Sequence, residues 1–327
     1  MKKIILSLMV VLMALTLMAC GGEEPEAAED KVNLGIIQVA EHPSLDVARQ
    51  GFLDVLSENG YLEGENLAVD YQNAQGDQAN LQTIARKFVQ DECDLVLAIA
   101  TQSAVTMANE TGDIPILITA VTDPVTAKLV ESLERPGTNV TGTTDINPVK
   151  EQLQLVKEIV PGAEKVGVIY NSSEVNSQVQ VDLADQAAPE LGLELVKVTV
   201  TASSEVMQAA QSLVGRVDAI YLPTDNMVIS SLAAVIGVAE ENKIPVISAE
   251  SNSVENGAVA TIGIDYYQLG RTTGEMALRV LKGEEPQNMA IQSQPGSDIV
   301  INLQAAERMG VTVSEDLKNK QIKIINE

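Results

Sequence analysis

The feature that most restricts the fold of this chain is a repeated alternation between short apolar runs and segments with helical periodicity. Residues 32–39 (VNLGIIQV) form an apolar run that predicts a strand, and the apolar residues of 45–56 then recur at the spacing of one helix face. Ser44 is expected to cap this helix, and Asp77 is expected to open the next one. Apart from Asp94, the runs at 94–99 (DLVLAI) and 114–118 (IPILI) are apolar throughout, which is typical of strands buried on both faces of a sheet. Strands that alternate with helices predict a parallel sheet covered by helices.

The same alternation starts again after residue 147, in the second half of the chain. Residues 94–101 (DLVLAIAT) parallel residues 218–225 (DAIYLPTD), and each segment is followed by a helical pattern and then by an Ile-Pro pair that leads into a strand. Two similar lobes explain this internal sequence similarity better than one long sheet does. We therefore predict an α/β protein with two Rossmann-like lobes, each built on a parallel sheet.

The first residues have the three parts of a secretory signal. A basic pair at 2–3 precedes an apolar run at 4–18, which is too short for a comfortable transmembrane helix, and the sequence Leu-Met-Ala then leads into Cys20. This order resembles the bacterial lipobox, so we expect residues 1–19 to be a lipoprotein signal peptide and Cys20 to carry the lipid. The alternative is a signal peptide that is cut elsewhere and leaves Cys20 unmodified.

Composition narrows what the rest of the chain can do. After Cys20, residues 21–30 are glycine, alanine and acids with one proline, so that we expect residues 20–30 to be a flexible acidic tether. The net charge of -25 argues against a nucleic-acid partner, because such a field repels phosphate backbones. The single histidine argues against a metal site, and no phosphate loop, dinucleotide fingerprint or nucleophile elbow is present. We expect no cofactor and no enzymatic activity.

Polar residues follow most of the predicted strands. In an open parallel sheet, ligands bind beyond the carboxyl ends of the strands, where loops meet helix N-termini. The residues at these positions are Glu41, His42, Thr101, Gln102, Ser103, Asp123, Asn171, Asp225, Asn226 and Glu250.

Two groups among them suit the two ends of a free amino acid. The segment 101–104 lies where a helix should begin, so that its free N–H groups and hydroxyls would receive a carboxylate. Asp225 and Glu250 have no basic neighbour in the sequence and could accept hydrogen bonds from an ammonium group. For each residue alone, ordinary helix capping explains its presence equally well.

Several short segments occur in order along nearly the whole mature chain: 41–46 (EHPSLD), 70–77 (DYQNAQGD), 119–125 (TAVTDPV), 139–142 (NVTG), 168–173 (VIYNSS), 221–226 (YLPTDN) and 263–267 (GIDYY). With these segments the chain resembles, from about Asn33 to Asn326, the ABC-transporter substrate-binding proteins of the tryptophan- and tyrosine-binding type.

The resemblance implies two α/β lobes of the type I periplasmic-binding-protein-like architecture, joined by a multi-strand hinge and closing over one ligand. It places residues 31–143 and 264–290 in the N-terminal lobe, and residues 144–263 and 291–327 in the C-terminal lobe. We expect a monomer that is anchored to the bacterial cell membrane on its extracytoplasmic side. It would deliver an amino acid, with an aromatic one favoured, to an ABC permease.

The same resemblance suggests roles for single residues. Carried over by position, it assigns the ligand carboxylate to Thr101, Ser103 and Ala104, and the amino group to Asp225 and Glu250, with Asn171 and Asp123 nearby. The chain departs from the family pattern after residue 100, where it reads TQSA in place of Thr-Pro-Ala-Ala or similar. Gln102 and Ser103 could therefore alter the floor of the pocket.

Aromatic partners for a ring are scarce in this sequence, which has no tryptophan. Phe52 and Phe88 fall on the core faces of predicted helices, so Tyr266 and Tyr267 are the better candidates. A sugar or nucleoside receptor of the same architecture is the main alternative. A surface hydrolase is a further one, and a transcriptional regulator would need a basic DNA-binding segment ahead of Lys31, where an export signal and an acidic tether stand.

Overall fold

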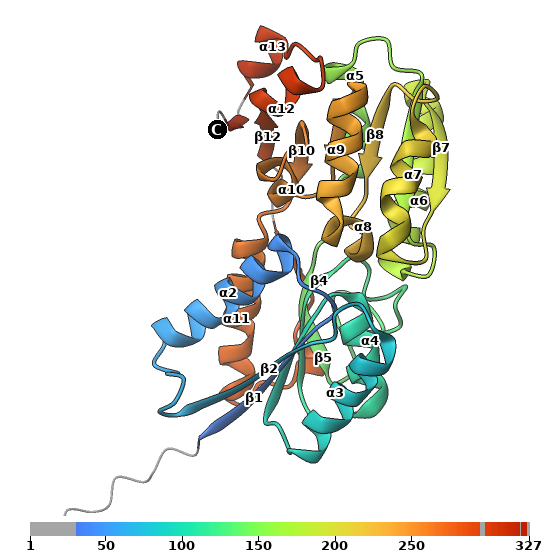
Figure 1. Cartoon of the computed structure of the whole chain (residues 1–327). Coiled ribbons are helices and arrows are strands. Elements are labelled where there is room, and N and C mark those ends of the chain that lie inside the picture. Colours follow the sequence, from blue (N-terminus) through green and yellow to red (C-terminus); the bar gives the residue numbers. More distant parts are fainter. Residues whose placement is uncertain (1–30, 295–297, 321, 326–327) are drawn as a thin grey trace, which may run out of the picture. The chain divides into compact units, whose positions relative to one another are not determined.

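The computed structural model describes residues 31–294, 298–320 and 322–325. The predicted signal peptide, the tether at 20–30 and the lipidation site at Cys20 lie outside these ranges. The compact unit that begins at Val32 contains a six-stranded and a seven-stranded sheet, each with its own hydrophobic core. Figure 1 shows the two sheets with their covering helices, which we call the first and the second lobe.

The first lobe is built on the six-stranded sheet, in the order β11-β5-β4-β3-β1-β2, with all paired strands parallel. Its strands are β1 (Val32–Gln38), β2 (Leu67–Asn73), β3 (Leu95–Ile99), β4 (Ile116–Val121), β5 (Val140–Thr144) and β11 (Gln292–Ser293). Its helices are α2 (Pro43–Glu58), α3 (Gln78–Gln90), α4 (Thr101–Glu110) and α11 (Tyr266–Leu281), with the 3-10 turn η3 (Pro286–Asn288) before β11.

The second lobe is built on the seven-stranded sheet, in the order β13-β12-β10-β9-β8-β6-β7. Its strands are β6 (Lys165–Tyr170), β7 (Glu194–Thr199), β8 (Ala219–Leu222), β9 (Val246–Ser248), β10 (Ala260–Gly263), β12 (Asp298–Asn302) and β13 (Ile322–Ile325). Only the β10–β12 pair is antiparallel among the pairs of this described sheet.

Helices and turns cover this second sheet. They are α5 (Val149–Ile159), α6 (Val175–Ala187), η1 (Ala188–Leu191), η2 (Ser203–Glu205), α7 (Val206–Leu213), α8 (Asn226–Ser230), α9 (Leu232–Asn242), α10 (Ser251–Glu255), α12 (Leu303–Arg308) and α13 (Glu315–Lys318). The two parallel-dominated sheets confirm the predicted α/β fold class.

Much of the local pattern is confirmed as predicted. Phe52 and Phe88 are fully buried in the core of the first lobe, and Asp77 caps α3 by accepting the backbone N–H of Asn80 at 2.9 Å. Ser44 differs from the prediction, because α2 begins at Pro43 and Ser44 lies inside the helix. Proline is favoured at a first helical position, where its fixed φ suits the helix and no N–H is needed.

The chain crosses between the two sheets after β5, after β10 and between β11 and β12. The expected boundaries at 143/144 and 290/291 lie beside the first and the last of these crossings. β5 continues to Thr144, Ile291 packs in the core of the first lobe, and β11 pairs with β5 before the chain returns to β12. Short edge strands such as β11 carry too little pattern to be seen in the sequence.

Helices α2 and α11 pack closely against each other in the first lobe (Figure 1). A Cβ atom at Gly270 would lie 1.9 Å from the carbonyl oxygen of Ala48, and one at Gly51 would lie 2.2 Å from that of Tyr267. Only glycine permits this approach of the two backbones. The contact fixes the N-terminus of α2, which carries His42 and Ser44 toward the second lobe.

Candidate functional site

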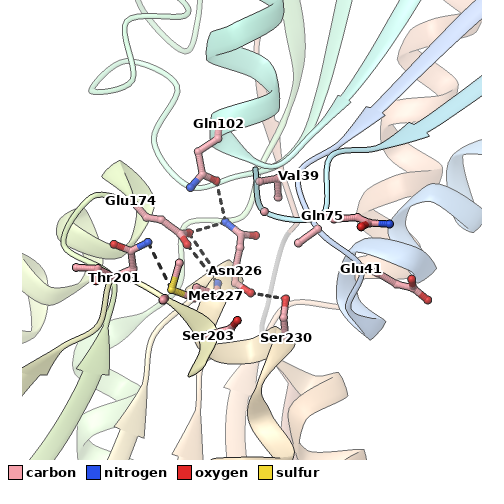
Figure 2. Close-up of a pocket in the computed structure, with 14 residues that line it drawn as sticks. Val39, Glu41, Gln75, Gln102, Glu174, Thr201, Ser203, Asn226, Met227 and Ser230 are labelled. Atoms are coloured by element: carbon pink, nitrogen blue, oxygen red, sulfur yellow. Dashed lines mark hydrogen bonds between the residues drawn. The ribbon is translucent and has the colours of Figure 1, made fainter. Parts of the chain in front are cut away.

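A cavity of about 490 Å³ lies between loops at the carboxyl ends of strands from both lobes. We call it the cleft cavity; Figure 2 shows its lining. The first lobe contributes Val39, Ala40, Glu41, Gln75, Gly76 and Gln102, and the second lobe contributes Asn171, Glu174, Thr201, Ala202, Ser203, Asn226, Met227 and Ser230. A cavity of this size is in the range of pockets for small molecules, ~300–1,000 Å³.

Asn226 stands at the centre of the contacts that cross between the lobes. Its Nδ2 donates to Oε1 of Gln102 at 3.2 Å and to Oε2 of Glu174 at 2.7 Å (Figure 2). Its Oδ1 lies 3.5 Å from Nε2 of His42, and Ser44 donates from Oγ to Oε2 of Glu250 at 2.5 Å. Side chains of the two lobes are therefore in direct contact around the cavity.

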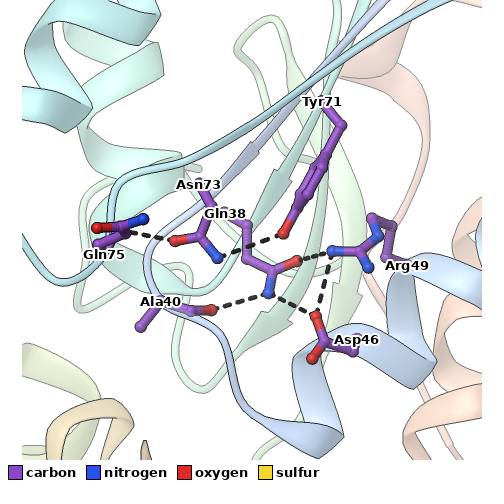
Figure 3. Close-up of polar contacts among 7 residues, drawn as sticks. All are labelled: Gln38, Ala40, Asp46, Arg49, Tyr71, Asn73 and Gln75. Atoms are coloured by element: carbon purple, nitrogen blue, oxygen red, sulfur yellow. Dashed lines mark hydrogen bonds and ion pairs between the residues drawn. The ribbon is translucent and has the colours of Figure 1, made fainter.

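The wall that the first lobe gives to the cavity is held by a polar network (Figure 3). Gln38, fully buried, donates from Nε2 to the carbonyl oxygen of Ala40 at 2.8 Å and to Oδ1 of Asp46 at 3.0 Å. Arg49 donates from Nη1 to Oε1 of Gln38 at 2.8 Å. In the turn at 73–76, the side chain of the first residue accepts the backbone N–H of the third at 2.8 Å. The two segments of the first lobe at 39–41 and 75–76, which line the cavity, are thus held in place by hydrogen bonds to neighbouring side chains.

Glu250 is a buried carboxylate with few partners, and like Thr101 and Ser103 it is not among the residues that line the cleft cavity. It is 3% exposed, and Ser44 is the one side chain that donates to it among the contacts of the described residues. Burial, followed by the charges of Asp145, Asp225 and Glu174, raises the pKa of Glu250 to about 8. Near neutral pH the carboxyl therefore holds a proton unless a cation comes to it.

Two more buried acids lie in the same region. Asp145 accepts from the hydroxyl of Tyr266 at 2.7 Å and from Oγ1 of Thr122 at 3.0 Å, and burial raises its pKa. Across the described ranges, no lysine or arginine forms an ion pair with Asp145, Asp225 or Glu250. Acids buried without a basic partner form a place where a cationic group is stabilised.

Asp225 is occupied by the protein itself. Its carboxylate accepts the backbone N–H of Asn171 at 2.6 Å, the hydroxyl of Ser177 at 2.7 Å and the backbone N–H of Val228 at 2.8 Å. Burial and the charge of Glu174 raise its pKa to about 7 against these donors. Asp225 thus caps α8 and ties it to the loop after β6, and it does not line the cleft cavity.

The start of α4 offers hydrogen-bond donors. The hydroxyls of Thr101 and Ser103 are buried and have no partner among the described residues. Ala100 turns the chain into the helix with a φ of 76°, and the first turn of any helix leaves N–H groups without helical acceptors. Ala104 is buried too, but its N–H donates to the carbonyl oxygen of Ala100 at 3.1 Å and is used within the helix.

The remaining expected site residues take different positions. Glu41, Gln102, Asn171 and Asn226 line the cleft cavity. His42 is buried against Asn226, and burial lowers its pKa to about 4, so its ring is neutral at pH 7. Asp123 lies outside the cavity lining and caps its own turn, accepting two backbone N–H groups at 3.0 Å.

Neither tyrosine that we expected to meet a ring lines the cleft cavity. The hydroxyl of Tyr266 is bound to Asp145, and that of Tyr267 donates to Asp54 at 2.8 Å between α11 and α2. No aromatic side chain is among the residues that line this cavity. The apolar side chains of the lining are those of Val39, Ala40, Ala202 and Met227. A ligand ring in this cavity would therefore contact aliphatic groups and a thioether, with no aromatic ring to stack on.

Glu174 is the main cavity residue that the sequence analysis missed. It is 2% exposed and accepts the backbone N–H of Asn226 at 3.1 Å and that of Met227 at 3.2 Å. Its position in the loop after β6, three residues beyond Asn171, was the available signal. Thr201, Ser203 and Ser230 were also missed, and they lie in loops and helix ends with no motif of their own.

Comparisons with known proteins show the family of this chain. Residues 33–325 match the family model described as ABC transporter substrate binding protein. The chain is 50% identical over 270 residues to the tyrosine-binding protein of Clostridioides difficile strain R20291, covering 83% of this chain and 78% of that protein.

Two solved structures differ in how well this chain superposes on them. An ABC domain in complex with L-Trp from Streptococcus pneumoniae is 34% identical, with a TM-score of 0.87 over 90% of this chain and 100% of that chain. A ligand-free, open substrate-binding protein from Clostridium difficile is 47% identical, with a TM-score of 0.68 over 90% of this chain and 99% of that chain. The arrangement of this chain is thus nearer to the L-Trp complex, despite the lower identity. From the match over 33–325 and the relative at 50% identity, the chain belongs to the family of ABC transporter substrate-binding proteins.

Proposed function

We propose that this chain binds a free amino acid with an aromatic side chain between its two lobes and delivers it to an ABC permease. The observation that carries the proposal is the buried Glu250, which lies without a basic partner where the lobes meet. An ammonium group would replace the proton that burial now favours on its carboxyl.

The carboxylate of the ligand would lie at the start of α4. Unpartnered hydroxyls of Thr101 and Ser103 and the free N–H groups of the first turn are donors that this end of a zwitterion needs. An uncharged sugar would leave Glu250 without a cation, and sugar sites commonly stack rings on aromatic faces, which the cavity lining lacks. A zwitterion therefore fits these groups better than a sugar or nucleoside does.

The relatives support an aromatic side chain. The relative at 50% identity is described as tyrosine-binding, and the solved relative at 34% identity holds L-Trp. The cleft cavity has room for such a side chain, with Met227 as a polarizable contact for a ring.

We further propose that the protein acts by binding alone and does so outside the cytoplasm, held by a lipid on Cys20. His42 is the one histidine of the chain, and among the described residues its ring contacts Asn226 and no serine, threonine or cysteine, so it activates no nucleophile for the cavity. None of the helices in the described ranges combines the length and apolar character needed to span a bilayer. Metabolic labelling with a radioactive fatty acid should mark the chain, and Cys20→Ser should abolish the label.

Isothermal titration of the mature protein with single amino acids and with sugars tests the binding proposal. We expect heat from aromatic amino acids and none from sugars, and a double variant Thr101→Val, Ser103→Ala should bind the amino acid at least about tenfold more weakly. Thr83→Val, on the exposed face of α3, is the matched control and should bind normally. Binding of a sugar, or full affinity in the double variant, would contradict the proposal.

A further inference from the structure

One side of the cleft cavity carries an amide that the protein leaves nearly unused. Asn171 is 6% exposed, and its Oδ1 accepts the backbone N–H of Ser173 at 2.9 Å, which fixes the orientation of the amide. Its Nδ2 meets only the sulfur of Met227, at 3.9 Å. A buried N–H donor with so weak a partner gains much from an oxygen acceptor.

Gln102 brings a second amide to the same place from the first lobe. Its Oε1 accepts from Asn226, so its Nε2 is the free end and has no acceptor among the described residues. In Figure 2 the dashed line to Asn226 starts at the oxygen of Gln102, and none starts at its nitrogen.

Glu174 adds an acceptor to these two donors. Its Oε2 is shared by Asn226 and Asn176, whereas its Oε1 accepts only the backbone N–H of Met227, at 3.2 Å. Asn226 joins Glu174 to Gln102, and Met227 joins Glu174 to Asn171. We call Gln102, Asn171 and Glu174 the amide–acid cluster.

We propose that the amide–acid cluster recognises a hydroxyl at the far end of the ligand's ring, so that the protein selects tyrosine over phenylalanine. This inference rests on the proposed function, because it assumes that the ammonium and carboxylate ends bind at Glu250 and α4. A phenol both donates and accepts, which matches the less occupied oxygen of Glu174, the weakly bonded amide N–H of Asn171 and the amide N–H of Gln102.

Other aromatic amino acids match the cluster less well. Phenylalanine offers it neither donor nor acceptor, so the buried amide of Asn171 would lose water without a replacement. The indole of tryptophan offers only a donor, which suits Glu174 but neither amide. A site built to bind a hydroxyl rejects a ligand that lacks it more strongly than an apolar pocket rejects an added hydroxyl.

Titration calorimetry with tyrosine, phenylalanine and O-methyltyrosine tests the inference on the unmodified protein. We expect tyrosine to bind about tenfold or more tightly than phenylalanine, the worth of one hydrogen bond in a largely buried site. O-methyltyrosine keeps the acceptor oxygen and loses the donor, so it should fall below tyrosine. Equal affinities for tyrosine and phenylalanine would overturn the inference.

Gln102→Leu and Asn171→Ala then show which residues read the hydroxyl. In both variants the ratio of tyrosine to phenylalanine affinity should fall toward one, whereas Gln50→Leu, on the outer face of α2, should keep the ratio of the parent protein. An equal loss for both ligands would mean that the cluster binds the amino acid's own charged groups, and the inference would be wrong while the proposed function stands. No binding of any aromatic amino acid would remove the proposed function itself.

Discussion

Ser44 of the first lobe donates a hydrogen bond to Glu250 of the second lobe, with 2.5 Å between Oγ and Oε2 and with both side chains buried. The pair is 206 residues apart in the chain, and it forms because α2 and α11 pack closely enough to hold the N-terminus of α2 against the second lobe. The acid expected to bind the ligand's ammonium group is therefore also a contact between the lobes. The same carboxyl group would thus serve both the binding of the ligand and the contact between the two lobes.

The first prediction concerns the charge of Glu250. Glu250→Gln keeps the shape and an acceptor oxygen but cannot become an anion, so we expect amino acid affinity to fall by about 1.5–3 kcal/mol, the worth of a hydrogen bond to a charged group. Titration calorimetry at pH 8 measures the change. Glu255→Gln, on the exposed side of α10, is the matched control, and an unchanged affinity in Glu250→Gln would place the ammonium elsewhere.

The second prediction is a pH dependence of binding. The pKa of Glu250 is raised to about 8, so below that pH the ligand-free carboxyl holds a proton, which an arriving ammonium group must displace. Affinity should therefore rise with pH between about 6 and 8, by at most about tenfold per pH unit for one proton, and then level off. Calorimetry in buffers of different ionisation enthalpy should detect the released proton, and Glu250→Gln should release none.

The third prediction concerns His42 and the stability of the fold. Burial lowers the pKa of this imidazole from 6.5 to about 4, so the unfolded chain binds a proton more readily than the folded chain does. The contribution of the neutral ring to the free energy of unfolding is complete above pH 6.5 and is lost as the pH falls toward 4. Measured by urea unfolding, the parent protein should lose up to about 3 kcal/mol relative to His42→Gln over this interval. A constant difference between the two proteins would show that the ring is not held neutral.

The fourth prediction concerns the close packing of α2 and α11. A Cβ at Gly270 would lie 1.9 Å from the carbonyl oxygen of Ala48, so Gly270→Ala must push the helices apart and should lower the free energy of unfolding by about 2–3 kcal/mol. Gly237, inside α9, has nothing within 4 Å of its Cβ position. Gly237→Ala is therefore the control and should stabilise the protein by up to about 1 kcal/mol. Thermal unfolding of both variants checks the contrast.

The parts of the fold that depend on local pattern could be predicted from the sequence. Apolar runs predicted the strands β1, β3, β4 and β8, and Asp77 could be predicted as a cap because its partner Asn80 is three residues away. Ser44 was expected to cap a helix for the same local reason. Its actual partner, Glu250, could not be found this way, since only the packing of two lobes brings the side chains together.

The sequence predicted where the candidate site lies better than it predicted what each residue there does. Strand ends pointed to Gln102, Asn171 and Asn226, which do line the cleft cavity. The sequence alone could not decide whether Asp225 caps a helix or binds a ligand. Its contacts in the structure, three hydrogen-bond donors from the protein itself, assign it to capping. Asp123 looked equivalent to it in the sequence and lies outside the cavity lining.

A crystal structure of the mature protein grown with tyrosine tests the central claim most directly. The account predicts the amino acid between the lobes, with its ammonium nitrogen within hydrogen-bond distance of Glu250 and its carboxylate at the hydroxyls of Thr101 and Ser103. A ligand bound with these ends reversed, or bound outside the contact between the lobes, would contradict it.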